Sequence, residues 1–157
     1  MKKPNPAEVA SQMSEALKLA REALTHDEVP VGAIITQNGI VVGRGFNRRE
    51  TDQNPTAHAE VLAIQDAAKN LGSWRLLDCV LHVTLEPCLM CLAACQQARL
   101  SKVIYGAKDP KGGALSLGYP LHEDMRTNHR FTVRYEACEA SSQILKDFFA
   151  AKRALRK

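Results

Sequence analysis

No stretch of the 157 residues is apolar for long enough to cross a lipid bilayer. The first residues include two lysines, but the mixed segment Ala7–Gln12 follows them instead of the apolar run of a secretory signal. Internal repeats and low-complexity segments are also absent from the sequence. These absences argue against a membrane protein and a secreted protein, so we expect a cytoplasmic one.

A large excess of either charge is also missing, because the formal net charge is only +4. The distribution of charge should therefore matter more than its total. Hydrophobic residues make up 45% of the chain, which at this length predicts a single domain, 1–157, with its own core. The five cysteines are an odd number and suit a reducing compartment better than a disulfide framework.

Two short motifs hold the residues that suit a catalytic metal site: His58-Ala59-Glu60 and Pro87-Cys88-Leu89-Met90-Cys91. Two cysteines separated by two residues fit a tetrahedral zinc ion, and one histidine adds a third ligand while leaving the fourth position open to water. Glu60 is close to such a metal without binding it, so it can carry a proton between that water and a substrate nitrogen. The motifs predict one zinc ion per subunit.

Each motif alone has an ordinary explanation. A lone pair of cysteines is also typical of buried thiols or of a redox pair, and a lone His-x-Glu carries little information. In this order, with Pro87 directly before the first cysteine, the motifs match the signature of zinc-dependent deaminases. We therefore interpret His58, Cys88 and Cys91 as metal ligands and Glu60 as the catalytic residue.

Cys95 needs a separate decision, because it follows Cys91 by four residues and shares its helix face. A third thiolate would close the metal to water. Cys95 would lie a full turn deeper, about 6 Å along the axis, where a small buried thiol is the usual occupant. We interpret the other cysteines and histidines as structural or unassigned residues: Cys79, Cys138, His26, His82, His122 and His129.

Hydrophobic periodicity and turn residues predict the elements of the N-terminal half. Apolar residues three and four positions apart, up to Leu24, predict a buried helix face, and Asn38-Gly39 predicts a hairpin turn between two antiparallel strands. The helix that carries His58 and Glu60 should end at Gly72. The expected helices are 6–24 and 57–70, the expected strands are 31–36 and 40–46, and a polar loop covers 47–55.

The C-terminal half reads as strand, helix and strand, followed by a long loop, an edge strand and a final helix. A right-handed crossover predicts that the first two of these strands are parallel. The expected strands are 79–85, 101–106 and 131–135, the expected helices are 88–99 and 136–155, and the loop 107–128 should hold a helical turn near 121–126. The metal would then lie between two helix N-termini, whose dipoles favour thiolates and carboxylates.

The final helix ends in the basic residues Lys146, Lys152, Arg153, Arg156 and Lys157. A basic helix end often only complements the helix dipole, but it is also suited to RNA phosphates. Ile144, Leu145, Phe148 and Phe149 are expected to pack inward, since aromatic residues at helical spacing are usually core, although one phenylalanine could contact a nucleotide. Asn47, just after a strand, is most simply a turn residue.

The sequence resembles the bacterial tRNA adenosine deaminase family of the cytidine-deaminase-like superfamily, from about residue 13 to 153. Beyond the metal motifs, the resemblance rests on Glu28-Val-Pro-Val-Gly-Ala33, Gly45-Phe-Asn47, Pro55-Thr-Ala-His-Ala-Glu60, Val83-Thr-Leu-Glu-Pro-Cys88, Gly106-Ala-Lys-Asp109, Asn128-His-Arg130 and Asp147-Phe-Phe149. The metal motif alone is shared by cytosine, cytidine and guanine deaminases. The Asn-His-Arg and Phe-Phe pieces are more specific to the tRNA enzymes.

The resemblance implies a three-layer α/β/α fold with a five-stranded mixed sheet between helices. It further implies a homodimer whose active sites involve both subunits, and hydrolytic deamination of adenosine to inosine at the first anticodon position, with the tRNA anticodon stem-loop as partner. By position it assigns Zn²⁺ to His58, Cys88 and Cys91, the proton shuttle to Glu60 and a base contact to Asn47.

The sequence departs from the family in one loop. Gly113–Tyr119 replaces a small-residue run that ends in Gly-Ser, and the charged segment Leu121–Arg126 follows. The difference concerns the loop and its RNA or dimer contacts, not the chemistry. Two other classes stay open: a metabolic deaminase of free guanine, cytosine or a nucleoside, and a zinc module without catalysis, against which the intact Glu60 argues.

Overall fold

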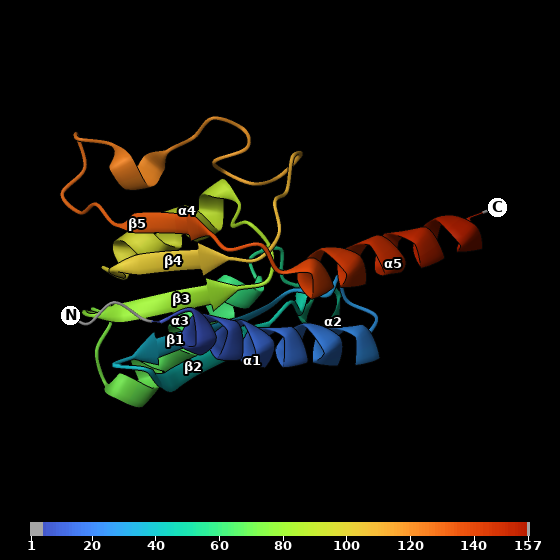
Figure 1. Cartoon of the computed structure of the whole chain (residues 1–157), viewed down its shortest axis with the longest axis horizontal. Coiled ribbons are helices and arrows are strands. Elements are labelled where there is room, and N and C mark those ends of the chain that lie inside the picture. The colour runs from blue at the N-terminus through green and yellow to red at the C-terminus, as the bar shows by residue number, and fades with distance from the viewer. Residues whose placement is uncertain (1–4, 157) are drawn as a thin grey trace.

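A five-stranded mixed sheet organises the chain (Figure 1). The structure, a computed structural model, describes residues 5–156; residues 1–4 and Lys157, on which the expectations about a leader and the last basic residue fall, lie outside this range. The elements in chain order are α1 (Pro6–Thr25), β1 (Gly32–Gln37), β2 (Ile40–Phe46), α2 (Arg49–Asp52), α3 (Ala59–Leu71), β3 (Cys79–Val83), α4 (Leu89–Gln97), β4 (Lys102–Tyr105), the 3₁₀ turn η1 (Leu121–Glu123), β5 (Thr132–Tyr135) and α5 (Glu139–Leu155).

The strand order is β2-β1-β3-β4-β5. β1 pairs antiparallel with β2 and with β3, whereas β3, β4 and β5 run parallel to one another. α1 covers one face of the sheet, and α3 and α4 cover the other (Figure 1). This arrangement confirms the expected three-layer α/β/α fold, the antiparallel hairpin and the parallel pair around α4.

The hairpin and the start of α3 follow from local backbone requirements. Asn38 and Gly39 both have positive φ angles, 53° and 78°, as the tight turn between β1 and β2 requires. Gly45 on β2 has a different role, because a Cβ atom there would lie 2.4 Å from the carbonyl oxygen of Ala59. Its missing side chain lets the first turn of α3, and with it His58, lie directly against the sheet.

Several boundaries and two packing expectations were wrong. The loop 47–55 contains the single helical turn α2, the strand that begins at Cys79 ends at Val83, and the last helix begins at Glu139. Leu24 is 38% exposed, since the last turn of α1 extends past the strands (Figure 1).

Phe149 was also expected in the core, and it is 45% exposed. Helix α5 projects away from the sheet (Figure 1), so its C-terminal half has no layer to pack against. Of its described residues only Ser141 and Leu145 are buried. Within residues 5–156, no helix is both long and apolar enough to cross a membrane.

Candidate active site

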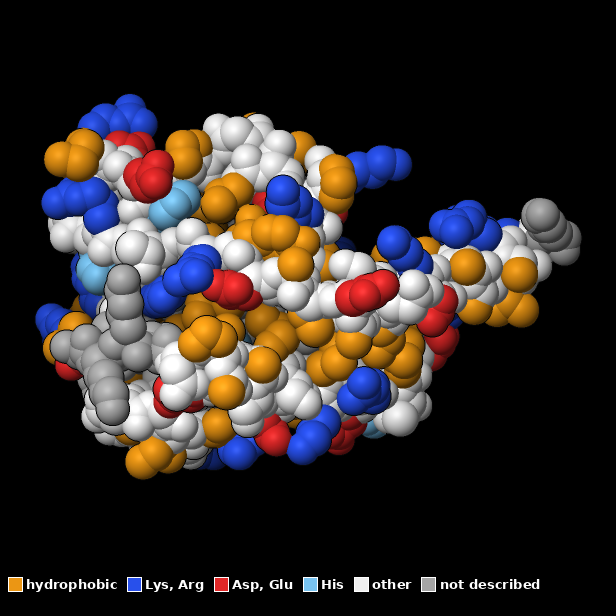
Figure 2. All heavy atoms as spheres, in the orientation of Figure 1, with side chains coloured by type: hydrophobic (Ala, Val, Ile, Leu, Met, Phe, Trp, Pro, Cys, Tyr) orange, Lys and Arg blue, Asp and Glu red, His pale blue; other side chains and the backbone are white. Residues whose placement is uncertain are grey.

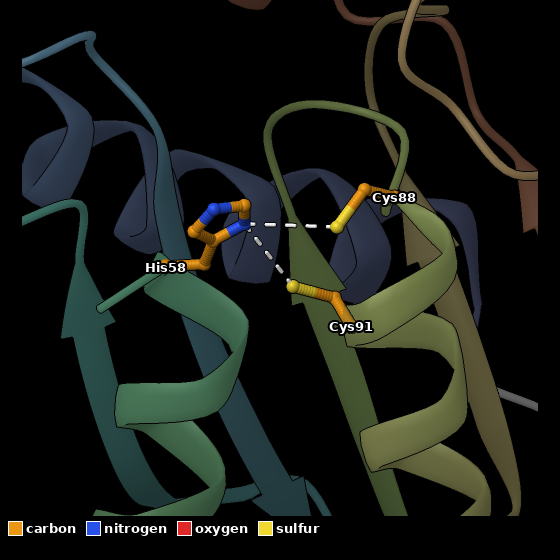
Figure 3. Close-up of side chains that lie close together, drawn as sticks. All are labelled: His58, Cys88 and Cys91. Carbon is orange, nitrogen blue, oxygen red and sulfur yellow. Dashed lines mark hydrogen bonds between the residues drawn. The ribbon is translucent and has the colours of Figure 1, made fainter. Parts of the chain in front are cut away.

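Three potential metal ligands meet at the N-termini of α3 and α4 (Figure 3). His58 is the N-cap residue of α3, Cys88 is the N-cap residue of α4, and Cys91 lies in the first turn of α4. The Nδ1 atom of His58 is 3.7 Å from the Sγ atom of Cys88 and 3.4 Å from that of Cys91. The structure thus brings together the three residues that the two motifs single out.

The spacing and chemistry of these three residues fit zinc. A tetrahedral ion with ordinary Zn–N and Zn–S bonds holds nitrogen and sulfur about 3.6 Å apart, and the two observed distances lie on either side of this value. Hydrogen bonding with Cys91 and with His58 lowers the pKa of Cys88 to about 4, while that same pairing and burial raise the pKa of Cys91. One thiol of the pair therefore readily becomes the thiolate that a metal binds.

Glu60 lies in the first turn of α3, close to the three ligands. Its side chain is almost completely buried, and burial raises the pKa of this carboxyl group. The hydrogen bond to Cys88 raises the pKa of His58 in turn. Glu60 is therefore poised to accept and release a proton, because its charged and neutral forms are closer in free energy than in an exposed glutamate.

A cavity of about 390 Å³ opens beside these groups and includes Asn47, His58, Glu60 and Cys88 in its wall. It is large enough for a nucleobase and is lined mainly by apolar atoms around a few polar groups, as small-molecule sites are. Further members of the wall come from the loops and from α5: Val29, Arg49, Leu85, Lys108, Asp109, Leu145 and Phe149.

Asn47 is buried at the rim between β2 and α2. Its Nδ2 atom donates to the carbonyl oxygen of Val29 at 3.2 Å, and its Oδ1 atom accepts from the backbone N–H of Arg49 at 3.1 Å. These two hydrogen bonds use only half of the hydrogen-bonding capacity of the side-chain amide, which has two N–H donors and two acceptor lone pairs. Asn47 is thus both the turn residue that its position suggests and a polar group facing the cavity.

Two buried carboxylates hold the loops on either side of the cavity. Glu28, which precedes β1, accepts hydrogen bonds from the backbone N–H groups of Glu50 and Thr51 and from the Thr51 hydroxyl, at 2.6 to 3.1 Å. Burial alone would raise the pKa of Glu28, but these hydrogen bonds outweigh it and lower the pKa. The carboxylate therefore stays charged and fixes α2, next to Asn47.

Glu86, just after β3, does the same for the opposite loop. It accepts from the backbone N–H groups of Asp109 and Ser116 and from the Ser116 hydroxyl, at 2.6 to 3.2 Å. Gly113 is required beside it, because a Cβ atom there would lie 2.0 Å from the carboxylate. The loop in which the sequence departs from its family is thus anchored directly at the cavity.

Several residues of the site were missed from the sequence. Leu145 was expected only in the core, and Phe149 was expected there too, with a nucleotide contact left open for one of the two phenylalanines. Glu28 and Glu86 belong to motifs of the family resemblance, but no role was assigned to them. The signal for Glu28 and Glu86 was an acidic residue within four positions of an apolar strand, where an unpaired charge is costly. Cys95 is fully buried on α4 and does not belong to the ligand cluster.

The remaining histidines lie away from the cavity. His82 is buried in β3, with its Nε2 atom 3.3 Å from the Thr36 hydroxyl. His122 and His129 both pack against the Phe131 ring, and the Nε2 atom of His129 lies 2.7 Å from the carbonyl oxygen of Leu100. These contacts fix the segment after η1 to the sheet.

Comparison with known proteins gives matches over almost the whole chain. The family model of MafB19-like deaminases matches residues 8–153. The tRNA-specific adenosine deaminase of Streptococcus pyogenes serotype M1 is 42% identical over 92% of this chain and 85% of its own length. The enzyme of the same name from Bacillus subtilis is 47% identical over 77% of this chain and 75% of its own.

Solved structures agree with these matches. One from studies of A-to-I editing by tRNA:A34 deaminases at the wobble position has a TM-score of 0.82 and 42% identity, and covers 87% of this chain and 99% of that one. A guanine deaminase from Bacillus subtilis has a TM-score of 0.61 and 32% identity, covering 92% of this chain and 93% of that one.

The sheet, the His-Cys-Cys cluster and the buried glutamate together define a hydrolytic deaminase with the cytidine-deaminase-like fold. Deaminases of this class act on free bases, nucleosides or nucleic acids. This chain has higher sequence identity to the tRNA-specific adenosine deaminases, 42% and 47%, than to the guanine deaminase, 32%. The chain belongs to the family of tRNA-specific adenosine deaminases.

Proposed function

We propose that the protein converts adenosine to inosine at the first anticodon position of tRNA by zinc-dependent hydrolysis. The observation that carries this proposal is the identity of 42–47% to tRNA-specific adenosine deaminases, together with the fit to a tRNA:A34 deaminase structure over 99% of that chain. A tRNA substrate is consistent with the cytoplasmic location expected from the sequence.

In this proposal His58, Cys88 and Cys91 hold one zinc ion per subunit. The ion, when bound, supplies a Lewis acid that makes water nucleophilic near neutral pH. Glu60 takes a proton from the attacking water and gives it to a ring nitrogen of the base as the water oxygen bonds to the ring carbon. It then moves the proton of the new hydroxyl to the amino nitrogen, so that the carbon–nitrogen bond breaks, ammonia leaves and a carbonyl forms. Its burial beside the ligands keeps bulk water from competing for that proton.

Asn47 is proposed to orient the adenine. Its two hydrogen bonds to backbone atoms hold the amide in one orientation, and its remaining donor and acceptor are available to the edge of a base. A pre-oriented amide can discriminate between bases because it costs no reorganisation when the substrate binds. The cavity accommodates a single base, so the adenosine must be turned out of the anticodon loop, where unstacking costs less than in a duplex.

A homodimer is also proposed, with α4 at its interface. Leu89 and Met90 are 41% and 36% exposed, whereas Leu92 on the same helix is fully buried. Two large apolar side chains beside the metal-binding end of α4 are suited to an interface that completes the site. Light scattering at micromolar concentration should report about twice the 17.3 kDa chain mass; a monomer would contradict this part.

The function is tested by offering the zinc-loaded protein two kinds of substrate. Total bacterial tRNA should gain inosine at the first anticodon position, detected by nuclease digestion and mass spectrometry, whereas free guanine and cytosine should stay intact. The guanine deaminase among the structural relatives makes free guanine the sharper comparison. Turnover of guanine with unmodified tRNA would establish the metabolic alternative instead.

A further inference from the structure

A groove of about 430 Å³ lies between α1 and the last two strands, on the face of the sheet opposite to α3 and α4. On this face α1 packs on β1, β2 and β3. Among the described elements, no helix continues the layer over β4 and β5, because α5 leaves the sheet at Glu139 (Figure 1). Part of one sheet face therefore has no covering helix. We call this space the α1 groove.

One side of the α1 groove is an apolar stripe of α1. Val9, Met13 and Leu17 line the groove at steps of four residues, so they lie on one helix face. Met13 packs against the fully buried Ile104 of β4, whereas Val9 is only partly buried. Figure 2 shows hydrophobic side chains gathered where α1 meets the sheet. The groove is therefore apolar over more than two turns of the helix.

The strands add charge to the α1 groove. Lys102 and Ile104 are two positions apart on β4 and so share one face of the sheet, and Arg134 is the register partner of Ile104 on β5. Arg134 and Glu136 both line the groove and pair with each other. Within residues 5–156, Lys102 forms no ion pair. Its ammonium group therefore gives the groove a net positive charge.

The α1 groove is also long. It runs from Lys102 at the start of β4 to Cys138, whose N–H donates to the carbonyl oxygen of Gly106 at 2.8 Å. The steps along the strand from Lys102 to Gly106 span about 13 Å. A groove with an unpaired cation at one end and apolar walls along its length is complementary to a linear molecule with an anionic head and an apolar tail.

We infer that the α1 groove binds a free medium-chain carboxylate, with the carboxylate at Lys102 and the alkyl chain along the apolar stripe of α1 toward Cys138. The ammonium group donates charge-assisted hydrogen bonds to the carboxylate, and each methylene removed from water adds to the affinity. An alkylamine would be repelled by Lys102, and an alcohol would leave its charge unpaired. The groove shares no wall residue with the reaction cavity, so this inference does not depend on the proposed function.

The first experiment measures binding of hexanoate, octanoate and decanoate to the zinc-loaded full chain by isothermal titration calorimetry, below their micelle concentrations. Each added methylene should lower the dissociation constant by about fourfold. Octylamine and 1-octanol should bind roughly threefold or more weakly than octanoate, because they lack the ion pair with Lys102. Equal affinities of octanoate and octanol, or no binding of decanoate at millimolar concentration, would overturn the inference.

Two pairs of variants locate the site. Lys102→Gln should weaken octanoate binding by roughly three- to tenfold, whereas Lys69→Gln, exposed on α3 at the other face of the sheet, should leave it unchanged. Ala10→Phe places a ring in the wall of the groove and should weaken decanoate binding by about tenfold or more. Ala7→Phe, exposed on α1 outside the wall, is its matched control. Equal effects within either pair, in variants that keep their zinc and melting temperature, would overturn the inference.

Alkylation of Cys138 reports the position of the alkyl chain. The other four cysteines are buried or proposed to bind the metal, so Cys138 is the accessible thiol of the zinc-loaded protein. Saturating decanoate should slow its reaction with iodoacetamide, followed by mass spectrometry, by roughly threefold or more. Hexanoate should slow this reaction less, because its shorter chain ends before Cys138. Bound decanoate that leaves the rate unchanged would place the chain elsewhere and overturn the inference.

A lipid membrane is the other source of alkyl chains with anionic heads. The α1 groove has room for one such chain and not for a phospholipid with two, so the wild type and Ala10→Phe should float alike with phosphatidylglycerol vesicles. Flotation of the wild type that Ala10→Phe abolishes would assign the groove to a lipid surface and overturn the inference.

Discussion

The sheet body, from α1 to β5, and the C-terminal helix α5 contribute to the same cavity in opposite ways. The sheet body brings its ligands, Glu60 and both loops into place through buried carboxylates and helix N-termini. Helix α5 contributes Phe149 and cations from a segment whose described residues after Leu145 are all at least partly exposed. Reaction chemistry requires fixed geometry, whereas a contact with a long RNA can be made by an outlying element.

The most damaging change to the sheet body is loss of a metal ligand. Cys88→Ala or Cys91→Ala should remove the bound zinc and with it all measurable deamination, because two protein ligands cannot hold the ion against water. Atomic absorption on purified protein measures the zinc. Cys95→Ala is the control on the same helix and should keep the metal; if this variant loses zinc and Cys91→Ala does not, the ligand assignment is wrong.

Glu60→Ala tests the chemistry without removing the metal. The variant should keep its fold, zinc and RNA affinity and lose a factor of at least about 10²–10⁴ in turnover, the usual effect of deleting a proton shuttle. Single-turnover assays with a stem-loop RNA give the rate. The Glu60→Gln variant keeps the volume of the side chain but cannot transfer the proton, so it shows whether the loss comes from the missing proton transfer or from the smaller side chain. Substantial deamination by zinc-loaded Glu60→Ala would exclude this role.

Glu86→Ala should destabilise the sheet body itself. The substitution leaves the N–H groups of Ser116 and Asp109 without their acceptor and should cost about 2–4 kcal/mol of unfolding free energy. Urea denaturation measures this difference. Glu22→Ala, an exposed glutamate on α1, is the matched control and should stay within about 0.5 kcal/mol. Equal effects of the two substitutions would show that Glu86 does not anchor the loop.

His82 should give the sheet body a pH dependence. Burial lowers the pKa of His82 from its usual 6.5 to about 4, so below pH 6.5 the unfolded chain takes up a proton that the folded chain does not. Stability is therefore lost as pH falls from 6.5 toward 4, by about 2 kcal/mol at pH 5. Between pH 7.5 and pH 5, the unfolding free energy of His82→Leu should fall by about 2 kcal/mol less than that of the wild type. Parallel plots of unfolding free energy against pH for the two proteins would contradict the lowered pKa of His82.

The sequence predicted those parts of the molecule that depend on local signals. The Asn38-Gly39 turn, the ligand spacing and the parallel strands around α4 each follow from neighbouring residues or from a general rule of chain handedness. The helical turn α2 does not, because its N–H groups are capped by Glu28, more than twenty positions earlier. A polar segment without periodicity gives no sign of such a distant acceptor.

The direction of α5 was beyond sequence analysis for a related reason. The spacing of its apolar residues predicts a buried helix face. The same spacing is found when a helix projects from the sheet and lines a ligand cavity. Only the packing of the whole chain decides between these outcomes. Phe149 is accordingly exposed at the cavity, while Leu145, one turn earlier, is buried as predicted.

Truncation after Lys146 should have the smallest effect on folding of these changes. It therefore tests whether helix α5, unlike the sheet body, serves RNA binding more than stability. The deletion removes residues 147–157 and no side chain that the structure describes as buried. It also removes the ion pair between Lys152 and Asp27, which is largely exposed and worth at most about 1 kcal/mol. The unfolding free energy should therefore fall by no more than about 1 kcal/mol, and the zinc should stay bound.

RNA affinity should nevertheless drop by roughly tenfold or more with a shallower salt dependence, since Phe149 and Arg153 are lost. A truncated, zinc-loaded protein that edits tRNA as efficiently as the full chain would show that α5 only completes the fold.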